Sequence, residues 1–586
     1  MWYGLRFDIA SIALINSLFI LMHVIPNPWR ETFKYQQILK LIFYAFNGAA
    51  LMMESGDFIY FRYGLKRTST HELGLTNDIE VIPMVIRDFW FIFILVLILT
   101  LLVELLYRRT EFIKKRSPLT FKPSIHYPTQ LAIMVVFLIM TVIGARGGIQ
   151  PQPLSPSLAS KAVKNEQLSE LVINTPFSVI YAFGHRKLEM PKFFKQDSLE
   201  TIFSPYHSQV DFYSDTSKPN ICVIVLESFS KEYIGYFNGG KGYTPFLDSL
   251  LGEGKVFSNF YANGKSSNQG IIAITSGIPV LMEEPFISSL YKDNAFIGIG
   301  SLLRQKGYYS SFYHGANNGS MGFDQFTQRA GFNAYYGRDE FANDEYFDGN
   351  WGIFDEPFLK YTAQSISELP QPFYAQAFTI SAHHPYTLPE AYKGKFPKGS
   401  IPMLEVIGYS DYALRGFFEE ASKQPWYDNT LFILTADHTG PPAPESKFYK
   451  NQVGAHSIWM LMYAPDGSFS GVDNRAAQQT DIFATVLDYA DYDNSYFAFG
   501  HSLFDTSYTG MAFGMHSGNY MFIENDTALL FNEATAPAVY HISNDSLLAN
   551  NLNNKENPTM SFMEYQLKAI IQSHHFAMIN NYLTPR

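Results

Sequence analysis

The stretch Asn220-Ile-Cys-Val-Ile-Val-Leu-Glu-Ser-Phe-Ser230 decides the fold. Its apolar residues, from Ile221 to Leu226, do not alternate with polar ones, which is typical of a strand buried on both faces of a parallel sheet. Glu227 then stands at the carboxyl end of that strand, where open α/β sheets place their ligand crevice. On its own, the stretch also fits a core strand that ends in a solvated glutamate.

A second stretch ends in the same way. The apolar run 431–436 is followed directly by Asp437 and His438. A carboxylate beside an imidazole suits Zn²⁺ or Mn²⁺, although a polar turn after a strand produces the same pair. The interpretation as a metal site requires Glu227 and the Asp437–His438 pair to meet around one cation.

A turn rich in hydroxyl groups lies between these strands. Gly264-Lys-Ser-Ser-Asn-Gln-Gly270 precedes an apolar helical run. A hydroxyl at the amino terminus of a helix meets free backbone N–H groups and the positive end of the helix dipole, which favour a phosphate and an alkoxide. An ordinary serine N-cap gives the same pattern. Lys265 in this turn fits either a phosphate contact or a solvated surface lysine.

Two histidines also follow predicted strands. His314 lies in Phe312-Tyr-His-Gly-Ala-Asn-Asn318, and His383 lies in Phe378-Thr-Ile-Ser-Ala-His-His-Pro-Tyr386. A single histidine after a strand is more often structural. Four strand ends that all carry ligand-type side chains are much less expected by chance, so the sequence favours one shared site.

The order of these motifs resembles the lipoteichoic acid synthase-like sulfatase family of the alkaline phosphatase superfamily. That order is strand-Glu, Gly-Lys-Ser-Ser, Phe-x-His-Gly, Ser-x-His-x-Pro and Ala-Asp-His, and it covers most of the chain. Two further stretches are similar to that family: residues 385–389 and Trp351-Gly-Ile-Phe-Asp355. The resemblance implies a membrane-anchored enzyme whose catalytic domain has a central, mostly parallel sheet.

The resemblance also implies a role for each site residue. Glu227, Asp437 and His438 match metal ligands, and Ser266 matches the family's nucleophilic threonine, which also binds the metal; Ser267 is the alternative nucleophile. His383 matches a histidine that serves the leaving group. The implied cofactor is one divalent cation, with Mn²⁺ expected ahead of Zn²⁺ or Mg²⁺. His314 matches a substrate-pocket histidine.

The sequence departs from the family at two positions. Synthases of this type carry Trp and Arg seven and nine positions after the histidine of the His-Gly motif, and here those positions hold Met321 and Phe323. Neither residue replaces the bidentate phosphate clamp of an arginine. Asn317, Asn318 and Lys265 are the candidates for substrate binding in its place.

The implied reaction moves a phosphoglycerol-type head group from a membrane phospholipid to an envelope acceptor through a phospho-serine. The acceptor is a glycan, a glycolipid or a polymer. Phosphoethanolamine transfer and phosphodiester or phosphomonoester hydrolysis are the near alternatives, and a non-catalytic envelope binding module is an alternative of another class. Ser266-Ser-Asn-Gln-Gly270 lacks the Pro and Arg that formylglycine formation requires, so sulfate-ester hydrolysis by that route is excluded.

The first 150 residues predict a membrane domain. Residues 9–25, 38–53, 89–106 and 131–144 are apolar runs near the length that crosses a bilayer. Six basic residues place the loop before the last run in the cytoplasm: Arg108, Arg109, Lys114, Lys115, Arg116 and Lys122. Counting back puts residue 1 outside, so we expect either a further helix upstream or a misassigned start codon.

The sequence therefore predicts four parts in 586 residues. They are transmembrane helices in 1–147, a linker or juxtamembrane helix in 148–217, the catalytic domain in 218–510 and a small antiparallel subdomain in 511–586. The expected location is the bacterial cytoplasmic membrane, with the catalytic domain outside the cell. A net charge of −11 leaves no footprint of nucleic-acid binding, and a single cysteine excludes an intrachain disulfide.

Overall fold

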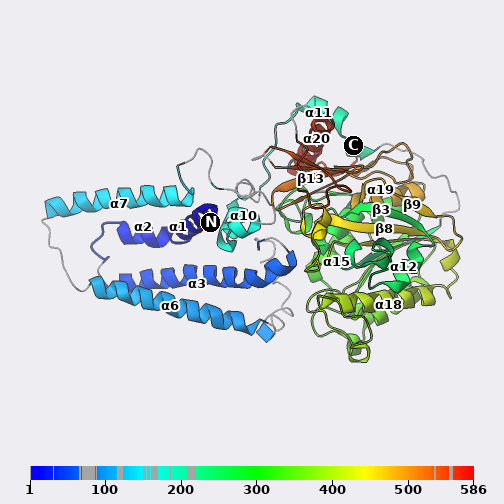
Figure 1. Ribbon diagram of the computed structural model, residues 1–586, viewed down its shortest axis with the longest axis horizontal. Coiled ribbons are helices and arrows are strands. Elements are labelled where there is room, and N and C mark those ends of the chain that lie inside the picture. Colours follow the sequence, from blue (N-terminus) through cyan, green and yellow to red (C-terminus); the bar gives the residue numbers. More distant parts are fainter. Residues whose placement is uncertain are drawn as a thin grey trace. The chain divides into compact units, whose positions relative to one another are not determined.

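The computed structural model describes residues 2–30, 32–64, 67–68, 86–87, 89–114, 123–149, 154, 159, 169–184, 187–207, 219–532, 536–553 and 558–585. The chain forms two compact units, Met1–His185 and Arg186–Arg586 (Figure 1). Much of the predicted linker, and the basic loop from Lys115 to Lys122, lies outside the described residues, so the orientation in the membrane stays a prediction.

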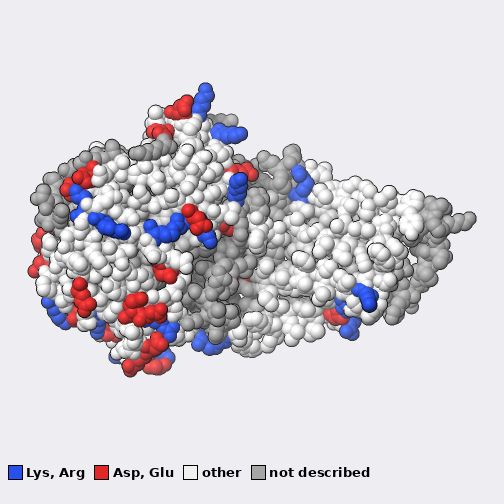
Figure 2. Space-filling view, turned by 180° about the vertical axis from the view of Figure 1, so that it is seen from behind, with Lys and Arg blue, Asp and Glu red and all other residues white. Residues whose placement is uncertain are grey.

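All four apolar stretches of the first unit are helical. The helices are α1 (Trp2–Ile15), α2 (Ser17–Val24), α3 (Phe33–Gly64), α6 (Trp90–Lys114) and α7 (Pro123–Ala145), followed by the short α9 (Ser169–Val172) and α10 (Thr175–Gly184). Helices α3, α6 and α7 are each long and apolar enough to cross a membrane, and α1 with α2 makes a fourth candidate span bent by 58°. Few charged side chains interrupt the described surface of this unit in Figure 2.

Polar residues inside these helices contact one another. Asn16, at the break between α1 and α2, accepts a hydrogen bond at 2.8 Å from the side-chain amide of Asn47 in α3. The Nζ atom of Lys40 in α3 lies 3.1 Å from a carboxylate oxygen of Glu104 in α6. Polar groups in a bilayer need such partners because no water is available there. These contacts explain how Lys40 and Asn47 are accommodated in an apolar span.

A nine-stranded mixed sheet forms the centre of the second unit, which confirms the predicted α/β fold. Its order is β10-β3-β8-β7-β2-β6-β4-β5, with β9 beside β3. The neighbours of β2, strands β6 and β7, are both parallel to it, whereas β8 is antiparallel to β3 and β7. The strands are β2 (Asn220–Leu226), β3 (Lys255–Tyr261), β4 (Tyr309–His314), β5 (Ala334–Tyr336), β6 (Phe373–Phe378), β7 (Thr430–Ala436), β8 (Ser457–Tyr463), β9 (Gly471–Asp473) and β10 (Ala477–Gln478).

Helices cover both faces of this sheet. One group comprises α12 (Pro245–Leu251), α17 (Asp355–Ile366) and α18 (Met403–Ala421); the other comprises α13 (Ser267–Ser276), α14 (Ile299–Gln305) and α19 (Gln479–Tyr489). In Figure 1, α19 lies above the strands and α12 with α18 below them. Every residue of β2 and of β7 is buried, as expected for central strands covered on both faces. The shorter α15 (Phe323–Arg329) and α16 (Arg338–Phe341) follow β4 and β5.

The end of the chain forms the predicted antiparallel sheet. Its strands are β12 (Ala512–His516), β13 (Asn519–Glu524), β14 (Thr527–Phe531) and β15 (Ala538–His541), joined in that order. Helix α20 (Pro558–Asn580) packs on β13 and β14, and α11 (Gln196–Ile202) packs on α20. A two-stranded sheet pairs β1 (Tyr206–His207) with β11 (Tyr496–Phe497). A second apolar core includes Phe522, Leu529 and Met563 of this subdomain together with Ile272 of α13 and Phe326 of α15.

Candidate functional site

Strand register brings the predicted residues to one edge of the sheet. Leu226 of β2 pairs with Ala436 of β7, and Val225 pairs with Phe378 of β6. Phe378 in turn pairs with His314 at the end of β4. Because these four strands are parallel, their carboxyl ends meet at the same edge. The residues that follow them therefore converge, although they lie up to about 200 positions apart in the chain.

Three side chains form a candidate cation site. One ligand atom each from Glu227, Asp437 and His438 lies within 4.8 Å of the others. The His438 Nε2 atom is 3.6 Å from Oε1 of Glu227 and 3.2 Å from Oδ2 of Asp437. Glu227 is 2% exposed and Asp437 is fully buried. Burial, and then the neighbouring Asp437, raise the pKa of the Glu227 carboxyl well above its usual value.

These residues fit a divalent cation. The Nδ1 atom of His438 lies 2.9 Å from the carbonyl oxygen of Thr439, which fixes the tautomer and leaves Nε2 as a ligand. Oδ2 of Asp437 is buried without a hydrogen-bond partner among the described residues. Two buried carboxylates and one imidazole suit Zn²⁺ or Mn²⁺, and a positive ion would offset their mutual repulsion.

Ser228 orients both carboxylates, and sequence reasoning missed it. Its backbone N–H donates to Oδ1 of Asp437 at 2.7 Å, and its hydroxyl donates to Oε1 of Glu227 at 2.6 Å. The residue adopts a φ of 60°, a conformation that residues other than glycine rarely adopt. No residue pattern signals this conformation, so the only available clue was the position of Ser228 directly after Glu227.

The structure brings Ser267, and not Ser266, to this cluster. The Ser267 hydroxyl donates to Oε2 of Glu227 at 3.0 Å and lies 3.5 Å from Nε2 of His438. Ser266 is the residue before α13, and its hydroxyl donates to Oδ1 of Asn268 at 2.7 Å. Consecutive residues at a helix start point in different directions, so a shift of one position decides which hydroxyl meets the carboxylates.

Lys265 lies beside the cation site and bonds to the turn that follows His438. Its Nζ atom donates to the hydroxyl of Thr439 at 2.6 Å and to the carbonyl oxygen of Ala455 at 2.8 Å. Burial lowers the pKa of this amine to about 7. Lys265 thus braces the turn after His438, and these contacts use two of its three donors.

Both predicted histidines lie in this region, in different surroundings. His314 is 1% exposed, stacks on Phe378 at a ring distance of 4.6 Å and meets Phe323 edge-on at 5.6 Å. Its Nδ1 atom lies 3.2 Å from the carbonyl oxygen of Phe378. His383 follows β6, with its Nδ1 atom 3.1 Å from the carbonyl oxygen of His384. Burial lowers the pKa of both imidazoles to about 4.

The residues proposed to replace the phosphate clamp have other partners. Asn317 accepts a hydrogen bond from Nη1 of Arg338 at 2.7 Å, and Asn318 donates to Glu340. Phe323, at the position where the resembling family has arginine, is fully buried. The side chains of both asparagines therefore bind to residues of α16, Arg338 and Glu340.

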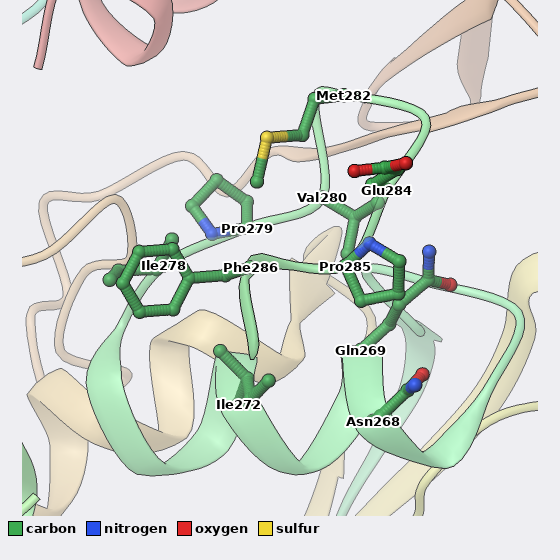
Figure 3. A pocket seen from close by; sticks show the side chains of 10 residues that line it. All are labelled: Asn268, Gln269, Ile272, Ile278, Pro279, Val280, Met282, Glu284, Pro285 and Phe286. Carbon is green, nitrogen blue, oxygen red and sulfur yellow. The ribbon is translucent and has the colours of Figure 1, made fainter. Parts of the chain in front are cut away.

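A small hollow lies beside α13, separate from the cation cluster. Asn268, Gln269 and Ile272 of α13 form one wall, and residues 278–286 form the other (Figure 3). Figure 3 shows the ring of Phe286 beside Ile278, with Ile272 below them on α13 and Glu284 above Gln269. None of the three candidate ligands lines this hollow.

This part of the chain is similar to known proteins. Residues 219–492 match the Sulfatase family. The chain is 26% identical over 331 residues to lipoteichoic acid synthase 1 of Bacillus subtilis and 28% identical over 328 residues to the lipoteichoic acid synthase of Staphylococcus aureus. The matches cover 52% and 50% of this chain and 52% and 49% of those proteins, so the chain spans about half the length of these relatives.

Solved structures agree on the fold. A protein of the alkaline phosphatase superfamily from Vibrio parahaemolyticus superposes with a TM-score of 0.60 at 23% identity, covering 69% of this chain and all of that one. The lipoteichoic acid synthase LtaP from Listeria monocytogenes gives 0.56 at 17% identity, covering 67% and 99%. Residues 219–492 are thus similar in sequence to the Sulfatase family and to lipoteichoic acid synthases, and the chain shares its fold with these two solved structures, which confirms the resemblance seen in the sequence.

The buried carboxylates predict a link between pH, metal and stability. Glu227 has a raised pKa in the folded chain, so the folded state binds more protons than the unfolded state above the ordinary value of 4.5. The free energy of unfolding without metal should therefore fall as pH rises from that value through the raised pKa, whereas the stabilisation by Mn²⁺ should grow as pH rises.

Mn²⁺ at 100 times its Kd should add about 2.7 kcal/mol to the free energy of unfolding. Thermal unfolding with and without Mn²⁺ measures this. Glu227→Gln should weaken the dependence on pH, since other buried acids also have raised pKa values, and should remove the response to Mn²⁺. A metal response retained in that variant would contradict the site.

Close approach between α13 and β7 predicts a strict requirement for Gly270. A Cβ atom there would lie 2.1 Å from the carbonyl oxygen of Asp437. Gly270→Ala should displace α13 from the cluster and cost about 1–3 kcal/mol of unfolding free energy. Gly56→Ala is the control, because a Cβ atom there meets no atom within 4 Å. Gly307→Ala is not suitable, because its φ of 89° adds strain. Denaturant unfolding measures the unfolding free energy of both variants. Equal values for Gly270→Ala and Gly56→Ala would contradict the requirement for glycine at position 270.

Proposed function

We propose that this chain is a membrane-anchored, metal-dependent phosphotransferase. It moves a phosphoglycerol-type head group from a phospholipid to an envelope acceptor through a phosphorylated serine. The observation that carries the proposal is the Ser267 hydroxyl at 3.0 Å from Glu227, beside Asp437 and His438. Homology to lipoteichoic acid synthases supports the choice of reaction, and the apolar helices of the first unit support membrane anchoring.

The nucleophile in this proposal is Ser267. A divalent cation held by Glu227, Asp437 and His438 would lower the pKa of the serine hydroxyl and neutralise phosphoryl charge. Ser228 keeps both carboxylates oriented, and the bond from His438 to Thr439 keeps Nε2 available. Ser267 would lose its hydroxyl proton to water as the cation binds, and each completed cycle would regenerate the alkoxide. That oxygen stands at the amino terminus of α13, where free backbone N–H groups favour a phosphate.

His383 acts as general acid and then as general base in this proposal. In the first half-reaction, the Ser267 oxygen bonds to phosphorus and the bond from phosphorus to the lipid glycerol oxygen breaks. Nε2–H of protonated His383 gives its proton to that leaving oxygen, which produces a diacylglycerol-type alcohol. The negative phosphate of the donor favours the protonated imidazole. In the second half-reaction, neutral His383 accepts the proton of the acceptor hydroxyl as that oxygen displaces Ser267.

The apolar helices of the first unit bear on where the enzyme works. We infer a bacterial cytoplasmic membrane protein with the sulfatase domain on the outer side, where donor lipids of the outer leaflet are within reach. The acceptor is a glycan, glycolipid or polymer end, and Mn²⁺ is the cation expected. Phosphoethanolamine transfer, simple hydrolysis and a non-catalytic binding role are the alternatives that experiment must exclude.

Serine substitutions test the nucleophile. Ser267→Ala should lower turnover of fluorescent phosphatidylglycerol by at least ~100-fold, because the covalent intermediate cannot form. Ser266→Ala should stay close to wild type and is the matched control, since its hydroxyl contacts Asn268 instead. Mn²⁺ binding, measured by calorimetry, should survive in both variants. If Ser266→Ala is the inactive variant, the nucleophile is Ser266, as first expected.

Head-group release tests the substrate. The full-length protein in nanodiscs with Mn²⁺ should release diacylglycerol from phosphatidylglycerol and leave a mass of one phosphoglycerol unit on the Ser267 peptide. Phosphatidylethanolamine in a parallel reaction is the comparison. A phosphoethanolamine adduct would shift the assignment to the near alternative, release without any adduct would favour hydrolysis, and no release by a Mn²⁺-loaded protein would favour the binding module.

A further inference from the structure

The tautomer of His383 is fixed by its neighbour. Its Nδ1 atom lies 3.1 Å from the carbonyl oxygen of His384. A carbonyl oxygen only accepts hydrogen bonds, so Nδ1 carries the hydrogen and the neutral ring leaves Nε2 bare. Nε2 is therefore the atom of His383 that can exchange a proton with a substrate.

Trp351 restrains this arrangement from one side. Its indole N–H donates to the same carbonyl oxygen of His384 that accepts from His383. Its ring also lies against the His383 ring, with centroids 4.2 Å apart and an angle of 55° between the planes. One side chain thus holds both the acceptor of the Nδ1 hydrogen and a face of the imidazole.

Asp355 fixes the start of the same loop. Its Oδ1 atom accepts from the backbone N–H groups of Ile380 at 2.8 Å and Ser381 at 3.0 Å. Its own N–H donates to the hydroxyl of Ser381 at 3.0 Å, and its Oδ2 atom accepts from Ser410 at 2.6 Å. Asp355 is 2% exposed, and bonds from a buried carboxylate to backbone N–H groups are among the stronger ones. The backbone two residues before His383 therefore has little freedom.

The segment that holds Trp351 and Asp355 also contacts the turn after His314. The N–H of Ile353 donates to the carbonyl oxygen of Gly315 at 2.9 Å. A Cβ atom on Gly352 would lie 2.3 Å from that oxygen, so only glycine permits this approach. Residues 351–355 thus connect the two histidine turns of the site.

We propose that Trp351 and Asp355 are positioning residues that hold His383 so that Nε2 is its reactive atom. This inference rests on the phosphotransferase function proposed above. It gives a role to Trp351-Gly-Ile-Phe-Asp355, which the sequence singles out without assigning its chemistry. The two side chains contact the loop and ring of His383, and none of the hydrogen bonds described above goes to Glu227, Asp437 or His438.

The test compares two leaving groups in the full-length protein with Mn²⁺. Diacylglycerol leaving from fluorescent phosphatidylglycerol needs a proton, whereas nitrophenolate leaving from bis(p-nitrophenyl) phosphate does not. Trp351→Phe and Asp355→Ala should each lower kcat for the lipid ~10–100-fold, a part of the usual contribution of acid–base catalysis. In the first turnover, before His383 has to accept a proton from the acceptor, the same variants should change the rate of nitrophenolate release by less than about threefold. Combined with His383→Gln, neither should lower lipid turnover further, because effects through one residue do not add.

Asp411→Ala is the matched control. Asp411 is also 2% exposed and also accepts from two backbone N–H groups, those of Phe246 and Leu247 at 3.0 and 2.9 Å, but these belong to α12. It should lose stability like Asp355→Ala while keeping the wild-type ratio of the two activities. Equal losses on both substrates in Trp351→Phe, or a further loss in the His383→Gln background, would overturn the inference.

A measurement without turnover separates this inference from the proposed function. If the wild-type protein cleaves neither substrate, the phosphotransferase proposal fails, and nitrogen NMR of ¹⁵N-histidine-labelled protein in nanodiscs decides the positioning role. His383, assigned with His383→Gln, should show one tautomer with hydrogen on Nδ1 in the wild type and in Asp411→Ala. Trp351→Phe and Asp355→Ala should give a mixture of both tautomers, and an unchanged single tautomer would overturn the inference.

Discussion

Repulsion between two buried carboxylates is the constraint on which the site depends. Glu227 and Asp437 end neighbouring parallel strands, so strand register alone forces their side chains together at one edge of the sheet. Both carboxylates are buried, and Oδ2 of Asp437 lacks a hydrogen-bond partner among the described residues. A fold that holds such a pair apart from water needs a compensating positive charge. The surrounding contacts, from Ser228 to His438, make chemical sense as the walls of a cation site.

Much of this arrangement could be predicted from the sequence, because it follows from strands. Uninterrupted apolar runs before Glu227 and Asp437 indicate buried parallel strands, and parallel strands bring their carboxyl ends to one edge. The order of the motifs then indicates the family fold. The same reasoning predicts the apolar helices of the first unit and the antiparallel sheet near the end of the chain, since both depend on periodicity over many residues.

What could not be predicted depends on single residues and local backbone geometry. Whether Ser266 or Ser267 faces Glu227 is decided by where α13 begins, and helix ends are the least certain part of any sequence interpretation. The φ of 60° at Ser228 leaves no trace in the residue pattern. The setting of His314 depends on Phe378 and Phe323, which come from another strand and from a later helix. These contacts are non-local, so the sequence can name His314 without showing that phenylalanines enclose it.

The two halves of the site are built by different means, and this bears on how such a fold changes its substrate. The acidic half is fixed by the ladder between β2 and β7 and by the close approach of Gly270 to Asp437, so it tolerates little variation. In the histidine half, His314 ends β4, whereas His383 stands on a loop that residues 351–355 hold in place from one side. Loops change more freely than central strands. In the proposed phosphotransferase, the cation site can thus stay constant while the loop that carries His383 changes.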